Sequence, residues 1–130
     1  MVENELRTTL LHLALVAAIA CIAQPALARA AKKGIHGAIA LQRDSGRFGY
    51  ASDALTSRAA KLEALKQCAD PHCEVVVTFT NACGALARNP ARGPKGYFPA
   101  TGAVRQEAET KALRLCAAKE CGLVAWACTK

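Results

Sequence analysis

The chain contains an internal repeat, and this repeat constrains the fold more than any other feature of the sequence. A shift of 47 residues aligns residues 37–40 (GAIA) with residues 84–87 (GALA). Further matches, with one residue of slip towards the end of the repeat, are Gly49 with Gly96, Tyr50 with Tyr97, Cys68 with Cys116, Cys73 with Cys121 and Val76 with Val124. Matches that keep their order over about forty positions indicate two copies of one structural unit.

Each copy predicts two strands, a helix and a third strand, in that order. In the first copy the strands are expected at 37–42, 47–52 and 74–80, and the helix over 58–68 with Ser57 as its N-cap. In the second copy the strands are expected at 84–88, 96–100 and 123–127, and the helix carries Ala108, Ala112 and Cys116 after Val104 at the capping position. Gly and Pro in the segments RDSGR and RNPARGPKG predict a turn between the first two strands of each copy.

The expected fold class is α+β, with two pseudo-symmetric ββαβ repeats, over about 36–82 and 83–130, in one compact domain stabilised by disulfides. One copy alone could hardly bury its apolar face, so the two are expected to pack with pseudo-two-fold symmetry. Alanines at four-residue spacing on each helix predict close approach to a sheet. The larger core side chains are expected to be Ile39, Val76, Phe79, Leu86, Val124 and Trp126.

The first thirty residues have the pattern of a secretory signal peptide. An apolar run over residues 10–23 is followed by A-x-A sites that end at Ala28 and Ala30. The run is too short and too poorly flanked for a transmembrane anchor, so no transmembrane segment is expected in the mature chain, residues 31–130. We expect a secreted or periplasmic protein. Lipid anchoring at Cys21 is the weaker alternative, because residues 18–20 fit a lipid-attachment box poorly.

Six of the seven cysteines lie after the signal peptide, and an even number in a small exported chain predicts a disulfide framework. Cys68 and Cys73 have the same separation as Cys116 and Cys121, so the repeat favours one bond within each pair. Cys83 and Cys128 then remain for the third bond. If strands 74–83 and 121–128 packed antiparallel, Cys83–Cys121 and Cys73–Cys128 would form instead. Zinc on the two C-x₄-C pairs is disfavoured by the oxidising compartment and the spacing, so no metal and no cofactor is expected.

The chain has a net charge of +7, and residues 1–30 contain two charges of each sign, so the mature chain keeps it. This charge suits an anionic envelope polymer or lipid, although solubility alone would also explain it. The candidate binding residues are the basic side chains of the two equivalent turns, as one surface or two related ones: Arg43 and Arg47 in the first, and Arg88, Arg92 and Lys95 in the second. Nucleic acid is disfavoured as a partner, because the protein is exported and no aromatic stacking motif interleaves these charges.

The sequence resembles a bacterial family known as domain of unknown function 4189. The resemblance covers about residues 37–128, and its most specific pieces are VVVTFTNACGALA (75–87) and VAWAC (124–128). Two positions depart from the family pattern, since His36 stands where Trp is common and Val104 where Ser or Thr is common. Members are typically small proteins with signal peptides, so the resemblance supports export. It implies no activity and no catalytic residues.

No constellation for hydrolase chemistry is visible in the sequence. His72 beside Cys73 suggests a Cys–His nucleophile, but a disulfide at Cys73 would remove the thiol. Glu107 and Glu109 are two apart on a helix, so they face different directions and suit the positive end of the helix dipole. The leading hypothesis is an exported non-enzymatic domain that binds an anionic envelope component or a protein partner. The alternatives are an enzyme with an unrecognised site and a purely structural envelope protein.

Overall fold

The structure, a computed structural model, describes residues 33–130. The expected signal peptide over residues 1–30, its cleavage sites at Ala28 and Ala30, and Cys21 lie outside these residues.

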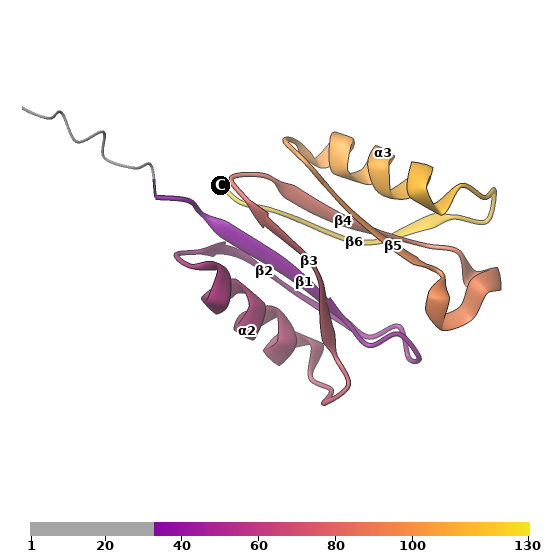
Figure 1. Cartoon of the computed structure of the whole chain (residues 1–130), viewed down its shortest axis with the longest axis horizontal. Helices are drawn as coiled ribbons and strands as arrows, with labels where there is room; N and C mark the ends of the chain where they lie inside the picture. Colours follow the sequence, from indigo (N-terminus) through magenta and orange to yellow (C-terminus); the bar gives the residue numbers. More distant parts are fainter. Residues whose placement is uncertain (1–32) are drawn as a thin grey trace, which may run out of the picture. The chain divides into compact units, whose positions relative to one another are not determined.

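The described residues form two ββαβ units, which confirms the expected α+β class (Figure 1). The first unit consists of β1 (His36–Leu41), β2 (Phe48–Ala54), α2 (Ser57–Cys68) and β3 (Glu74–Thr80). The second unit consists of β4 (Cys83–Arg88), the 3₁₀ segment η1 (Pro90–Lys95), β5 (Tyr97–Gly102), α3 (Arg105–Cys116) and β6 (Gly122–Cys128).

Each unit folds its strands into one antiparallel sheet, and the two sheets have the same topology. The first strand of the unit is central in both, with strand orders β2-β1-β3 and β5-β4-β6. One irregularity of the pairing also corresponds. The register shifts between Ile39 and Ala40 in the first sheet and between Leu86 and Ala87 in the second, and these positions are equivalent under the 47-residue shift. A second shift, between His36 and Ala38 in the pairing of β1 with β2, has no counterpart in the pairing of β4 with β5.

Each helix lies on one face of its own sheet through a layer of small residues. Ala60, Ala64 and Cys68 of α2 are buried against Ala38 and Ala40 of β1. The equivalent layer of the second unit pairs Ala108, Ala112 and Cys116 of α3 with Ala85 and Ala87 of β4. Alanine leaves little side chain between the backbones, so the helices approach the sheets closely, as the sequence predicts.

The helix starts differ from the expectation in one respect. The N-cap of α2 is Thr56 and not Ser57, because the Thr56 hydroxyl accepts a hydrogen bond from the Ala59 N–H at 3.1 Å. At α3, Val104 occupies the capping position and makes no side-chain bond. The Glu107 carboxylate instead accepts from the N–H of Ala103, one residue before the capping position, at 2.7 Å, and so satisfies a backbone donor at the helix start.

The outer faces of the sheets carry the helices, and the inner faces of the sheets pack on each other (Figure 1). Residues of both units meet between the sheets: Leu41 with Leu86, Tyr97 and Ala125, and Ile39 with Phe79 and Ala127. The expectation of a buried Trp126 is wrong, since this side chain is 44 % exposed. Strand alternation turns it away from the inner face towards the start of α3, where the Arg105 guanidinium lies 3.7 Å from its ring centre.

One aromatic ring fills the middle of the space between the sheets. A Cβ atom added at Gly37 would lie 2.1 Å from the Phe79 ring, and one added at Gly84 would lie 2.6 Å from it. Gly37 and Gly84 are equivalent in the repeat. The Phe79 ring therefore spans both equivalent glycines, and the repeat partner of Phe79, Ala127, has a small side chain beside it.

Three disulfides join Cys68 to Cys73, Cys116 to Cys121 and Cys83 to Cys128. This is the pairing that the repeat favours, and the alternative through Cys83–Cys121 does not occur. Cys83 and Cys128 are direct cross-strand partners in their sheet. The equivalent partners in the first sheet are His36 and Thr80, whose side chains are hydrogen-bonded at 3.0 Å between Nδ1 and Oγ1. A polar pair thus stands in one unit where a covalent bond stands in the other.

The disulfides are expected to contribute unequally to stability. Cys83–Cys128 joins residues 45 apart, whereas Cys68–Cys73 joins residues 5 apart. Replacing both cysteines of the long bond with Ala should lower the free energy of unfolding by about 4 kcal/mol, and the same change at the short bond by about 2 kcal/mol, on the chain-entropy account. Urea unfolding of the two double variants measures the difference. Equal losses would contradict the prediction.

The ring of Phe79 should make Gly84 intolerant of a side chain. The Gly84→Ala variant should lose about 1–3 kcal/mol of stability, because the added methyl forces the ring to move in a packed layer. Gly122→Ala is the matched control, since no heavy atom lies within 4 Å of the added Cβ, and it should change stability by less than about 0.5 kcal/mol. The same urea midpoint for both variants would refute the role given to Phe79.

Candidate functional site

The two basic turns lie at the same end of the described part of the chain (Figure 1). Gly46 of the first turn lies against the second hairpin. A Cβ at this glycine would be 2.9 Å from the Tyr97 hydroxyl and 3.7 Å from Nη1 of Arg88. The φ angle of Gly46 is +73°, which favours glycine at this contact. The fold therefore places the equivalent turns next to each other, as a shared surface requires.

The cations of the first turn are engaged within the protein. Arg43 forms an ion pair with Glu74. Nη1 of Arg47 donates to the carbonyl oxygen of Ala69 at 3.1 Å, which directs the side chain towards the end of α2. Asp44 adds a negative charge to the same turn. The first turn therefore presents little uncompensated positive charge.

Within residues 33–130, the cations of the second turn have no such partners. No Asp or Glu occurs between Cys83 and Gly102. The Arg88 guanidinium lies 5.2 Å from the ring centre of Tyr97, and that of Arg92 lies 5.4 Å from the ring centre of Phe98. Lys95, at the end of η1, is exposed. Aromatic rings hold two cations in place without neutralising them, so the second turn is the more strongly positive surface.

Two buried polar atoms at this end are unsatisfied. Nε of Arg88 and the hydroxyl of Tyr97 have no hydrogen-bond partner within residues 33–130. Tyr97 is only 5 % exposed, and Arg88 is half-buried. Buried donors are rarely left without an acceptor, because each costs about 1–3 kcal/mol. Both atoms are covered by the protein itself, so a ligand would meet the exposed charge of the second turn and not these two atoms.

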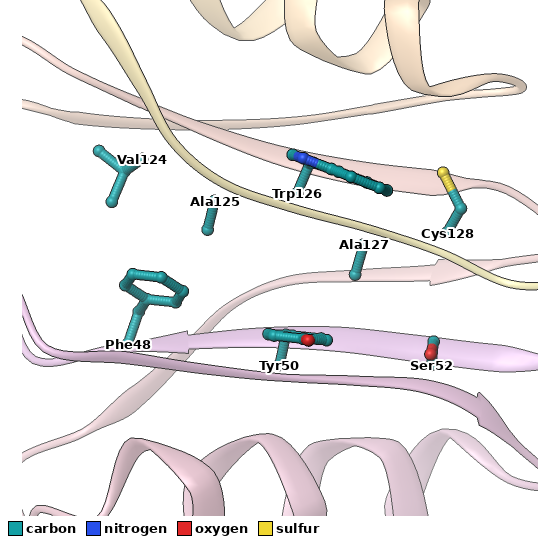
Figure 2. A pocket seen from close by; sticks show the side chains of 8 residues that line it. All are labelled: Phe48, Tyr50, Ser52, Val124, Ala125, Trp126, Ala127 and Cys128. Carbon is teal, nitrogen blue, oxygen red and sulfur yellow. The ribbon is translucent and has the colours of Figure 1, made fainter.

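A second feature is an apolar groove of about 380 Å³ between strands β2 and β6, which the sequence analysis missed. Phe48, Tyr50 and Ser52 of β2 form one wall, and residues 124–128 of β6 form the other. Figure 2 shows the β2 side chains directed towards β6, and Ala125 and Ala127 directed towards β2. The signal in the sequence is the alternation of Phe48 and Tyr50 with Gly49 and Ala51, which points two aromatic rings to one face of an edge strand.

The residues considered for catalysis are held in structural contacts. His72 is exposed, and its Nδ1 lies 3.3 Å from the carboxylate of Asp70. Its neighbour Cys73 is in a disulfide and supplies no thiolate. Glu107 pairs with Lys111, and Glu109 pairs with Arg105, both at 2.6 Å.

The pKa of the Glu107 carboxyl lies below its ordinary value, first because Lys111 donates a hydrogen bond to it, and also because the Ala103 N–H does. A lowered pKa keeps this group ionised, which suits a helix start and not a proton donor. Within residues 33–130, no three His, Cys, Asp or Glu side chains gather as a metal site would require. No helix in this part of the chain is long and apolar enough to cross a membrane.

Several mycobacterial proteins are similar to this chain. Protein Rv1269c and protein MT1307 of Mycobacterium tuberculosis and protein Mb1300c of Mycobacterium bovis are each 38 % identical to it over 77 residues. This match covers 59 % of the chain and only 60 % of the length of those relatives.

A solved structure has the same fold. The NMR structure of Rv1813c from Mycobacterium tuberculosis superposes with a TM-score of 0.54 at 34 % sequence identity, over 72 % of this chain and 75 % of that one. The protein-family model described as Domain of unknown function (DUF4189) matches residues 36–128, which is most of the chain. The match confirms the resemblance seen in the sequence, and the chain belongs to this DUF4189 family.

Proposed function

We propose that this protein is an exported, non-enzymatic binding domain whose ligand is an anionic component of the cell envelope. The ligand binds at the second hairpin turn, through Arg88, Arg92 and Lys95. Export is supported by the apolar run and A-x-A sites of residues 1–30 and by three disulfides, which persist in oxidising compartments.

The observation that carries the proposal is the uncompensated positive charge of the second turn. Arg88, Arg92 and Lys95 form no ion pair within residues 33–130, and no acidic residue lies between Cys83 and Gly102. Carboxylate and phosphate oxygens are the acceptors that a guanidinium binds most strongly. An anionic polymer offers many such groups and would also respond to the net charge of +7.

The division of charge between the turns refines the expectation from the sequence. Arg43 is paired with Glu74, and Arg47 is bonded to a backbone carbonyl, so both are placed to flank the ligand and not to hold it. Arg88 and Arg92 lie on aromatic rings, so they lose little side-chain entropy on binding. The second turn is accordingly the centre of the proposed site.

Charge removal at the second turn should weaken binding far more than equal charge removal elsewhere. We expect the triple variant Arg88→Gln, Arg92→Gln, Lys95→Gln to bind polyphosphate or poly-glutamate at least about tenfold more weakly than the parent protein, because charge-assisted hydrogen bonds are lost. The salt dependence of the dissociation constant should also become less steep, because fewer counterions are released. Fluorescence anisotropy with a labelled polymer at several salt concentrations measures both effects.

The matched control is Arg58→Gln, Lys61→Gln, Lys66→Gln on the exposed surface of α2, which removes the same three charges. It should change the dissociation constant by no more than about threefold, which is the effect of reduced net charge alone. If both triple variants lose affinity equally, binding depends on overall charge, and the assignment to the second turn is wrong.

A further inference from the structure

The two sides of the space between the sheets are equivalent in the repeat but differ in how they are filled. On the side of β3 and β5, Phe79 and Tyr97 close the space, and each is only 5 % exposed. On the side of β2 and β6, the equivalent residues are Ala127 and Tyr50, and Tyr50 is 45 % exposed. The groove between β2 and β6 is therefore equivalent, in the repeat, to the space that side chains fill between β3 and β5.

The openness of this side follows from the packing at the centre. The Phe79 ring already spans Gly37 and Gly84, so a second phenyl ring at position 127 would have to enter the same volume. Residue 127 is therefore small, and Tyr50 lacks the neighbour that would cover it. The groove is a consequence of how the two units pack and not of a mobile loop.

The dimensions and lining of the groove suit one extended apolar chain. Phe48 and Ser52 are four residues apart on a strand, so the groove extends for about 13 Å. Aromatic rings line one wall, and the small side chains of Ala125 and Ala127 line the other. The polar side-chain groups of the lining are the hydroxyls of Tyr50 and Ser52 and the indole N–H of Trp126, so few polar groups would be desolvated by an apolar occupant.

The two ends of the groove differ in charge. The end at Phe48 and Val124 adjoins the basic turns, because Phe48 directly follows Arg47 in the chain and the cross-strand partner of Arg88 is Gly122, two residues before Val124. At the other end, the Asp53 carboxylate accepts a hydrogen bond from the Lys130 N–H at 2.7 Å, which ties β2 to the chain after β6. An occupant would therefore have its anionic group at the first end and its apolar part between β2 and β6.

We propose that the groove binds the single unbranched acyl chain of an anionic amphiphile, with the anionic head group at Arg88 of the second turn. The head-group contact rests on the proposed function, whereas the chain contact rests on the groove alone. The ligand of the second turn is then a lipid-like anion. In the polymer-binding experiment, polyphosphate or poly-glutamate supplies the anionic groups that its head group would supply.

The test is a titration of the intact oxidised protein with hexanoate, octanoate and decanoate, all below their micelle concentrations. Each added methylene should strengthen binding by about threefold to fourfold until the groove is filled. The amide signals of Tyr50, Ala125 and Ala127 should shift in NMR spectra, and calorimetry gives the dissociation constants. Decanol should bind at least about tenfold more weakly than decanoate, because it lacks the charge that Arg88 meets.

Two variants separate the chain contact from the head-group contact. Ser52→Phe fills the groove from an exposed strand position and should abolish the dependence on chain length, whereas Thr101→Phe, at an exposed position of β5, should preserve it. The triple variant of the second turn should weaken binding by the same factor at every chain length.

Three results would overturn the inference: the absence of a chain-length dependence, equal binding of decanol, or occupation of the groove by a second copy of the protein. Sedimentation velocity without ligand detects the last. Each of these results would leave the polymer-binding experiment to decide the proposed function separately.

Discussion

The contact on which the structure depends is that of the Phe79 ring with the two equivalent glycines, Gly37 and Gly84. Both central strands lack a side chain where the ring lies, so the two sheets can share one aromatic group between them. A symmetric pair of rings would not fit. The two units therefore have the same sheet topology, but the side chains that they contribute to the core between the sheets differ. Ile39, Leu41 and Leu86 are buried around this centre and form the layer that neither unit could build alone.

The covalent framework repeats less strictly than the backbone. Both units carry a short disulfide at the end of the helix, but only the second has one between its first and third strands. His36 and Thr80 occupy the equivalent places in the first unit and form a hydrogen bond. The hydrogen bonds just beyond correspond as well. Ile35 and Asn81 in the first unit, and Ala82 and Thr129 in the second, bond to each other in the same way. A disulfide in one unit and a hydrogen bond in the other can occupy equivalent positions, because backbone hydrogen bonds already pair the strands.

The departures from symmetry are also the features that suggest function. The first turn balances its cations with Glu74 and Asp44, whereas the second turn holds Arg88 and Arg92 on aromatic rings, without acidic partners in the described part of the chain. Similarly, one side of the inter-sheet space is closed, and the other is an open groove with exposed aromatic rings. Together they describe a surface that is cationic at one end and apolar along its length.

The sequence by itself determined the repeat and the order of the elements, and it favoured the observed cysteine pairing over the alternative through Cys83–Cys121. These follow from short-range signals: alternation in strands, alanine stripes on helices, turn residues and the spacing of Cys68 and Cys73. The basic residues of both turns could also be recognised, because those of each turn lie within eight residues of one another in the chain. Only the tertiary structure decided that Glu74 neutralises Arg43, that Trp126 faces outwards, and that β2 and β6 enclose a groove. Each of these depends on which residues distant in the chain become neighbours. For the groove, the sequence shows Phe at position 79 and Ala at the equivalent position 127, but only the packing of the two sheets shows that the Phe79 ring fills the space between them.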